Sequence, residues 1–517
     1  MSMKSQLIHE TTPVRVESGK ARTGGRRWWA LAIIAGVALA LFVVPRVSPE
    51  QASAVHPDHG IVCNDGTEFF LRATEGYISE PDGNSLYMWS YALDDGPGTV
   101  FQYPGATLCV EEGDTVTVHL ANDLPEPVSI LFLGQEGVEA DEGSGFELAQ
   151  PQYDIGLTSL TNVAPPGEDV IYRFTASEPG TYIYESGTEP DKQVQMGLVG
   201  ALIVRPKVSD VPGGIAGHTY AYDDVATEYD PDREFLLLFH EIDPFLHRAV
   251  ELGQPYNITE LQFHYWTISG RSMPDTAAPN NAPWLPSQPY GALVVLEPYD
   301  LIGNPLPALV RIANPGMANH PFHPHANHVR VIAQDGRQLK GPAPGYKDLS
   351  YEKFTRTTGS GQTFDAMFKW TDVEGFRPVT AEFLAQCDNN TDDDDDTKVN
   401  DGCPTVGLYP ETDCGDSIDN DDDLAVNDGC PAFGNPVPVQ IPGLQNLVFM
   451  DDATFYSGSP YLGYTGDLPV GVTSYNQCGE QYFPWHSHAL NEFQNFDEGF
   501  GGLGTILRVD PPGGCTP

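Results

Sequence analysis

Residues 113–122 read Gly-Asp-Thr-Val-Thr-Val-His-Leu-Ala-Asn, and the run at 115–120 is typical of a β-strand. Turns rich in proline and glycine, such as those at 81–84 and 165–168, punctuate the chain at the spacing expected of a β-sandwich. Further strand-like runs lie at 69–73, 170–174, 198–204, 233–240, 291–296, 308–312 and 503–509. We therefore expect an all-β protein.

The length and composition agree with this fold class. The chain has 517 residues, 40% of them hydrophobic, and its 53 Gly, 45 Pro, 23 Tyr and 24 Phe favour short strands joined by turns over a helical bundle. We expect two β-sandwich domains, at 61–207 and 215–510. An acidic segment at 387–431 lacks apolar periodicity and is expected to be an insertion into a loop of the second domain.

The charge is strongly acidic. Asp and Glu number 72 against 26 Lys and Arg, which gives a formal net charge of -46. Such a surface repels phosphate backbones, so nucleic acid is excluded as a partner. The acidity suits the binding of cations, or solubility in a salty exterior where ions screen the self-repulsion.

The N-terminal segment at 1–54 indicates the cellular compartment of the protein. Residues 28–44 form an uninterrupted apolar run, and Ala-Ser-Ala at 52–54 fits a cleavage site for a signal peptidase. Basic residues precede the run: Lys4, Arg15, Lys20, Arg22, Arg26 and Arg27. The segment is a cleaved signal or a retained membrane anchor, and both remain open. Either way, the folded part is expected to be exported and to be periplasmic, cell-surface or secreted.

Eight cysteines in an exported chain indicate disulfides. Four of them belong to an internal repeat whose two copies both end in Val-Asn-Asp-Gly-Cys-Pro. The simplest pairing closes each copy, Cys387 with Cys403 and Cys414 with Cys430. One pair then remains for each flanking region, Cys63 with Cys109 and Cys478 with Cys515.

The repeat also places oxygen ligands at regular positions of a loop. These are Asp392, Asp394, Asp396 and Asn400 in the first copy and Asp419, Asp421, Asp423 and Asn427 in the second. Calcium takes six to eight oxygen ligands, so each copy is expected to bind calcium. The pattern resembles thrombospondin type 3 repeats and departs from an EF-hand, because Thr397 and Leu424 stand where an EF-hand has glycine. The alternative is a solvated acidic linker held by disulfides.

Two histidine clusters indicate a metal site. His320, His323, His325 and His328 form one cluster, and His486 and His488 form the other. A His-x-His pair on a strand puts both imidazoles on one face, about 6.6 Å apart along the chain, so two pairs on neighbouring strands can converge on a metal. Imidazole ligands suit copper, zinc or iron, and the spacing does not choose between them. The alternative is a hydrogen-bonded core that persists after a metal has been lost.

At this point the chain resembles the multicopper oxidases, which are built from cupredoxin domains. The segment at 113–122 is similar to the opening of the family's first domain, and Gly-Thr-Tyr-Ile-Tyr at 180–184 to its end. In the second domain, Arg-Ile-Ala-Asn at 311–314, the His-Pro-x-His-x-His segment and Asp-Gly at 335–336 follow the family pattern. The resemblance covers residues 61 to 510 outside the insert, and it is closest to the two-domain subgroup. It implies a homotrimer.

The resemblance implies a type 1 copper and a trinuclear copper cluster, but several ligand positions differ. His320 matches a type 1 histidine, whereas Ser487 and Glu492 replace the cysteine and a second histidine. In the first domain, Leu131, Leu133, Glu185 and Gly187 stand at histidine positions, and of these only Glu185 can ligate a metal. His323, His325, His486 and His488 match the surviving half of the trinuclear site. His320, His328 and Glu492 are further candidate ligands.

Two hypotheses follow. In the first, the chain is an exported non-oxidase descendant that binds one or two metal ions at the surviving histidines or serves as a scaffold. In the second, it is a working copper-dependent oxidase of metal ions or phenols that uses unusual ligands or obtains the missing ligands from a partner. A homotrimer would not repair the loss, because each first domain lacks the same ligands.

Overall fold

The computed structural model describes residues 59–370 and 481–510, apart from short gaps at 95–98, 155–156, 300–303, 327, 342–346, 497 and 500. Within these residues the chain consists mainly of strands, and its two α-helices, α2 (Pro190–Gln193) and α3 (Pro244–Glu251), are short. The expected all-β fold is confirmed. No helix in this part of the chain is long and apolar enough to cross a membrane. Residues 1–54, including the apolar run at 28–44, lie outside the described residues.

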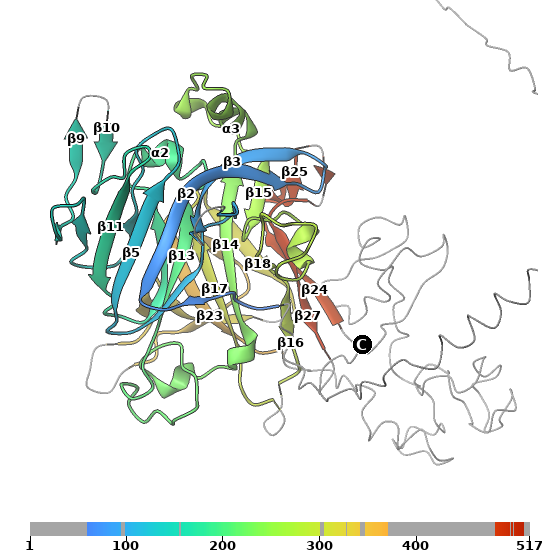
Figure 1. Cartoon of the computed structure of the whole chain (residues 1–517). Coiled ribbons are helices and arrows are strands. Elements are labelled where there is room, and N and C mark those ends of the chain that lie inside the picture. The colour runs from blue at the N-terminus through green and yellow to red at the C-terminus, as the bar shows by residue number, and fades with distance from the viewer. Residues whose placement is uncertain are drawn as a thin grey trace, which may run out of the picture. The chain divides into compact units, whose positions relative to one another are not determined.

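The first β-sandwich consists of a five-stranded and a six-stranded sheet (Figure 1). The five-stranded sheet has the order β1 (Asn64–Asp65), β4 (Leu108–Glu111), β13 (Val199–Arg205), β12 (Gly180–Glu185) and β6 (Leu131–Phe132). The six-stranded sheet has the order β3 (Ser85–Leu93), β2 (Glu68–Ser79), β5 (Thr115–Asn122), β11 (Asp169–Thr175), β7 (Glu139–Asp141) and β8 (Glu147–Leu148). A separate ribbon pairs β9 (Gln152–Asp154) with β10 (Leu157–Ser159). In β5, Val116, Val118 and Leu120 are buried in the core between the sheets, as the period of a strand requires.

The second β-sandwich consists of a seven-stranded and a five-stranded sheet. The larger sheet has the order β15 (Tyr265–Ile268), β14 (Glu234–Ile242), β17 (Ala308–Asn314), β23 (Gln362–Phe368), β19 (Val329–Gln334) and β20 (Arg337–Gln338), and β21 (Tyr351–Lys353) also pairs with β19. The smaller sheet has the order β16 (Val294–Leu296), β27 (Gly504–Val509), β24 (Gln481–Ser487), β18 (His320–Pro324) and β22 (Arg356–Thr358). A ribbon pairs β25 (Gln494–Asn495) with β26 (Glu498–Gly499). Figure 1 shows β24 and β27 in red beside β16 and β18, far apart in sequence but adjacent in the sheet.

The two sandwiches share an apolar cluster. Ile183 and Val199 of the first sandwich belong to the same buried cluster as Leu238 and Ala313 of the second. The hydroxyl of Thr181 in β12 donates to Asp365 in β23 at 2.6 Å. Polar and apolar contacts therefore both join the sandwiches.

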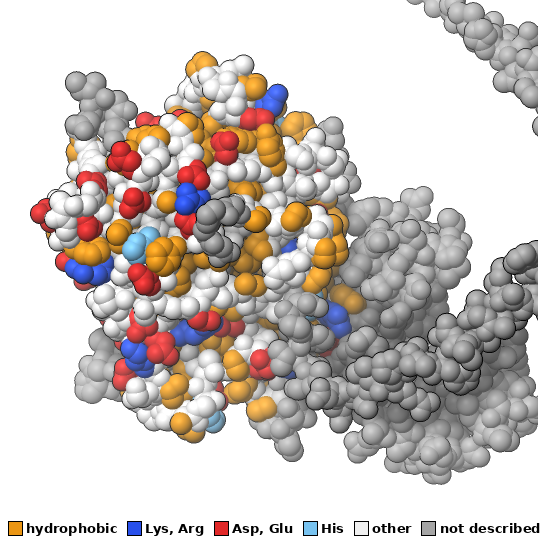
Figure 2. All heavy atoms as spheres, viewed as in Figure 1, with side chains coloured by type: hydrophobic (Ala, Val, Ile, Leu, Met, Phe, Trp, Pro, Cys, Tyr) orange, Lys and Arg blue, Asp and Glu red, His pale blue; other side chains and the backbone are white. Residues whose placement is uncertain are grey.

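The strand-like runs of the sequence correspond to strands. The run at 115–120 lies in β5, the run at 233–240 in β14 and the run at 503–509 in β27. Cys63 and Cys109 form a disulfide, as predicted. The remaining cysteines and the acidic segment at 387–431 lie outside the described residues. Figure 2 shows Asp and Glu side chains spread over the visible face of the molecule rather than gathered at one place.

Candidate metal centre

The predicted histidine pairs lie on two adjacent antiparallel strands. In the register of β18 and β24, His323 is opposite His486 and Phe322 is opposite Ser487. Opposite residues of an antiparallel pair point to the same face, and successive residues point to opposite faces. The histidines therefore share one face of the ribbon, while Phe322 and Ser487 are buried on the other.

The four imidazoles come together on that face. Neighbouring ring centres of His323, His325, His486 and His488 are 4.6 to 6.0 Å apart. Nε2 of His325 is 3.1 Å from Nε2 of His486. The two rings are hydrogen-bonded to each other at this distance. Two nitrogens on one tetrahedral metal ion, each about 2.0–2.1 Å from it, are about 3.3 Å apart, so the same separation is also compatible with a shared ion.

The contacts around the rings fix which nitrogens can bind a metal. Nδ1 of His486 lies 2.7 Å from the carbonyl oxygen of Ser487, to which it donates, so Nε2 keeps a free electron pair. Nδ1 of His325 is buried without a hydrogen-bond partner. Nδ1 of His323 contacts the hydroxyl of Thr355, and Trp485 donates from its ring to the backbone oxygen of His325 at 3.1 Å.

Burial and neighbouring rings keep three of the four imidazoles uncharged. Burial lowers the pKa of His323, His325 and His486, and neighbouring imidazoles lower it further. The pKa of His325 falls to about 4. These rings are therefore neutral at pH 7, and the neutral ring is the form that ligates a metal.

The four imidazoles lie close together, but their nitrogens do not surround a single ion position. Among the described residues, one set of three His, Cys, Asp or Glu side chains has all its donor atoms within 4.8 Å of one another, namely Cys63, Asp65 and Cys109. Its two sulfurs are bonded to each other and are not free to ligate. No three of the four histidines meet this distance in the described part of the chain, so their rings would have to move to enclose an ion, whereas their donor chemistry suits copper, zinc or iron.

His320 and Glu492 are not part of this cluster. His320 is fully buried, and its two ring nitrogens face carboxylates on both sides: Nε2 is 3.1 Å from Glu241 and Nδ1 is 2.9 Å from Glu492. The same Glu492 oxygen accepts a hydrogen bond from the hydroxyl of Ser487 at 2.5 Å. Burial opposes the charge on His320, but the hydrogen bonds to the two carboxylates outweigh it and raise the pKa of His320 to about 9. Both ring nitrogens of this predicted ligand are thus engaged by protein groups.

Sequence reasoning missed Glu241. It lies in the apolar strand β14, where its other carboxylate oxygen accepts hydrogen bonds from the backbone N–H groups of Met317 and Ala318. A charged residue in a run that is otherwise apolar was the available signal, because buried charges need partners.

His328 and His323 both pack against Phe354, whose ring centre is 5.5 Å from that of His323. The ring of His328 packs against Phe354 with 5.2 Å between ring centres. His328 also lines an open cleft of about 540 Å³ together with Arg330 and Glu352.

The first sandwich presents no imidazole at the positions that the resemblance marked. Glu185 is opposite Leu131 where β12 pairs with β6. A Cβ atom at Gly187 would meet the Leu131 side chain at 2.8 Å, so this leucine fills the space beside residue 187. Burial raises the pKa of Glu185 to about 7.

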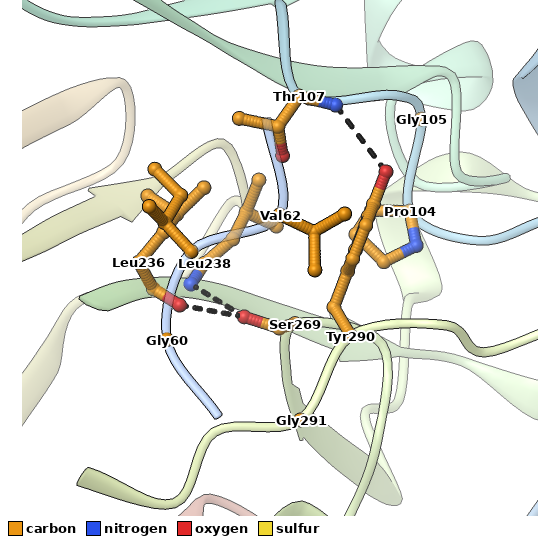
Figure 3. A pocket seen from close by; sticks show the side chains of 11 residues that line it. Gly60, Val62, Pro104, Gly105, Thr107, Leu236, Leu238, Ser269, Tyr290 and Gly291 are labelled. Carbon is orange, nitrogen blue, oxygen red and sulfur yellow. Dashed lines mark hydrogen bonds between the residues drawn. The ribbon is translucent and has the colours of Figure 1, made fainter. Parts of the chain in front are cut away.

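A small hollow near the junction of the sandwiches is no alternative site. It is lined by Gly60, Val62, Leu236, Leu238 and Tyr290 among others (Figure 3). Its volume of about 10 Å³ has room for about one water molecule. The predicted calcium ligands Asp392, Asp394, Asp396, Asn400, Asp419, Asp421, Asp423 and Asn427 lie outside the described residues.

Comparisons with known proteins point to one family. Residues 98–209 match the family model described as multicopper oxidase. Multicopper oxidase MCE of Talaromyces pinophilus is 33% identical over 107 residues, which are 20% of this chain and 16% of that protein. Laccase-1 of Emericella nidulans is 30% identical over 184 residues, 33% of this chain and 27% of that protein. The chain thus spans less than a third of either curated relative. The blue copper oxidase of Nitrosomonas europaea has a TM-score of 0.45 and 16% identity, over 86% of this chain and 85% of that one.

Proposed function

Because the chain is a member of the multicopper oxidase family, we propose that it binds one or two transition-metal ions, copper foremost, at the four clustered histidines. The observation that carries the proposal is the approach of Nε2 of His325 and Nε2 of His486 to 3.1 Å within a group of four imidazoles.

The chain's own residues hold and orient the ligands. Thr355 and the carbonyl of Ser487 each engage one nitrogen of a ring, which selects the nitrogen that faces the ion. Phe493 stacks on His486 with 4.9 Å between ring centres and limits the rotation of that ring. A copper ion held there would supply one-electron redox and Lewis-acid chemistry.

We further propose that the ordinary route for electrons is missing. A type 1 copper needs a thiolate. Ser487 carries a hydroxyl instead, and this hydroxyl donates a hydrogen bond to Glu492. Both ring nitrogens of His320 are hydrogen-bonded to carboxylates. These contacts support a metal-binding family member over a phenol or metal-ion oxidase.

Elemental analysis of the full chain, purified without chelator or added metal, tests the proposal. We expect about one or two transition-metal ions per chain, and their loss in the double variant His486→Ala, His488→Ala. His218→Ala and His264→Ala are the matched controls, because those rings lie outside the cluster against Glu228 and Phe496. Folded wild-type protein that binds neither copper nor zinc at micromolar concentration would refute the proposal.

Export and calcium binding remain part of the proposed function. The basic and apolar N-terminal segment and the Cys63–Cys109 disulfide support an oxidising compartment. The repeated Asp positions support calcium in the insert. Limited proteolysis with calcium and with chelator tests the insert: protection of residues 387–431 by calcium is expected, and equal cleavage in both conditions would leave an acidic linker.

A further inference from the structure

The hydrogen-bonded group Glu241, His320, Glu492 and Ser487, here called the buried clamp, joins four parts of the second sandwich. Glu241 comes from β14, His320 from β18 and Ser487 from the end of β24, and Glu492 belongs to the 3₁₀ turn η6 (Leu490–Phe493). The residues are 0 to 7% exposed. The hydrogen bonds of His320 to the carboxylates span 79 and 172 residues of sequence.

We propose that the buried clamp positions the His486–His488 pair, and this inference rests on the proposed metal site. Ser487 stands between the two histidines with its side chain on the opposite face of the strand. The hydroxyl of Ser487 donates a hydrogen bond to Glu492. The hydroxyl oxygen of Ser487 also accepts a hydrogen bond from the backbone N–H of Ala489 at 3.2 Å. The backbone that carries both imidazoles is therefore fixed from the side away from the metal.

The two contacts of His320 with carboxyl groups indicate the state of the clamp. The two carboxylate oxygens that face His320 can accept from it only if each ring nitrogen carries a proton. His320 is then a cation that donates to two carboxyl groups, and such charge-assisted hydrogen bonds are stronger and more directional than neutral ones. A charge buried this way holds its partners in one arrangement, because a displaced partner would leave a buried charge unpaired.

The surroundings are shaped for this arrangement. A Cβ atom on Gly316 would meet Oε2 of Glu241 at 2.2 Å, so a larger residue here would force the carboxylate to shift. The group is not a serine nucleophile with its base, because the hydroxyl of Ser487 is hydrogen-bonded to Glu492 rather than to His320 and is sealed from solvent. The arrangement of the buried clamp therefore supports a role in positioning the His486–His488 pair.

Nuclear magnetic resonance of the full chain, labelled with ¹⁵N-histidine and free of metal, tests the clamp directly. We expect His320 to show protons on both ring nitrogens, and His486 and His488 to show one set of signals each. In Ser487→Ala and in the isosteric Glu492→Gln, those two histidines should show broadened or multiple signals. Ser487→Thr, which keeps the hydroxyl, should restore single signals. Ser272→Ala is the matched control, since it removes another buried hydroxyl, one that donates to the backbone oxygen of Trp266.

A metal titration separates the clamp from the proposed function. We expect affinity for copper to fall about tenfold in Ser487→Ala and Glu492→Gln, within the range seen when groups behind metal ligands are removed. If wild-type protein binds no metal but the histidine signals change as expected, the clamp stands and the metal site fails. If the variants bind copper like wild type and keep single histidine signals, the clamp is overturned. A single protonated nitrogen on His320 would also overturn it. Should Ser487→Ala fail to fold, Glu492→Gln decides alone.

Discussion

At the scale of the residue, the proposed metal chemistry depends on Ser487. A hydroxyl cannot form the strongly covalent copper–thiolate bond of blue copper sites. The hydroxyl is also no spare ligand, because it donates to Glu492 at 2.5 Å. The histidines on either side keep their imidazoles for the opposite face.

We therefore expect copper-loaded protein to show no intense visible band from thiolate charge transfer. Phenol oxidation coupled to the consumption of dioxygen should also be absent. Absorption spectroscopy and an oxygen electrode check this with the full chain after copper loading. A blue protein that oxidises phenols without a partner would contradict the assignment of Ser487 and Glu492.

Glu80 is a second residue whose environment predicts behaviour. It is 4% exposed, one carboxylate oxygen accepts from Asn495 at 3.1 Å, and the other has no hydrogen-bond partner. Burial, reinforced by Asp82 and Asp275, raises the pKa of Glu80 to about 8. The carboxyl is therefore neutral in the folded protein at pH 7.

This raised pKa fixes the sign of a pH effect. Stability from Glu80 is fully present below its unfolded pKa, near 4.5, and is lost as the pH rises through about 8. The variant Glu80→Gln should lack this loss, which we put at roughly 2–4 kcal/mol. Urea unfolding at pH 5 and pH 9 measures it. Glu136→Gln, at an exposed carboxylate, should unfold like wild type at both pH values.

At the scale of the element, the paired strands β18 and β24 separate two kinds of chemistry. One face of the ribbon carries the four imidazoles, and the other carries His320 and Ser487 in the buried clamp. Glu241 reaches this clamp from β14 only because Gly316 leaves room for its carboxylate.

Gly316→Ala should consequently destabilise the protein by about 1–3 kcal/mol, since the added methyl group overlaps Glu241. Denaturant unfolding provides the measurement. Gly499→Ala is the matched control, because its added Cβ would meet nothing within 4 Å. Equal stability of the two variants would show that the carboxylate can move aside.

The same elements show what a sequence can and cannot predict. The run at 115–120 and the two His-x-His pairs are local patterns, and the structure places them in β5 and on the paired strands β18 and β24. The sequence predicts His320 and Glu492 as further metal ligands, and the structure shows them hydrogen-bonded to each other across 172 residues. No local spacing encodes such a pair. The role of Glu241 depends on the packing of β14 against the loop at Met317, which only the fold reveals.

At the scale of the whole molecule, a buried ion network links the two sandwiches. Arg311 is fully buried and donates to Glu234 at 2.6 Å and to Asp365 at 3.2 Å. It also donates to the hydroxyl of Thr181, from the first sandwich, at 3.0 Å. The network therefore spans the junction, beside the apolar cluster that the sandwiches share.

Replacing Arg311 with Met should lower stability by about 3–5 kcal/mol, because Asp365 then loses its cation inside the protein and Glu234 is left with its pair to Arg205. The measurement is urea unfolding at pH 7. Arg248→Met is the control: its pair with Glu251 is exposed, and its loss should change stability by about 0.5 kcal/mol or less. A similarly small effect of Arg311→Met would mean that water or a rearranged partner reaches the junction.

The disulfide between Cys63 and Cys109 has a consequence for the integrity of the chain. It closes a covalent ring, with a sequence separation of 46, that contains the strands β2 and β3. A protease that cuts the turn at 81–84, between these strands, opens this ring without dividing the molecule. Both pieces stay joined through sulfur, so damage at this turn releases no fragment until a reductant is present.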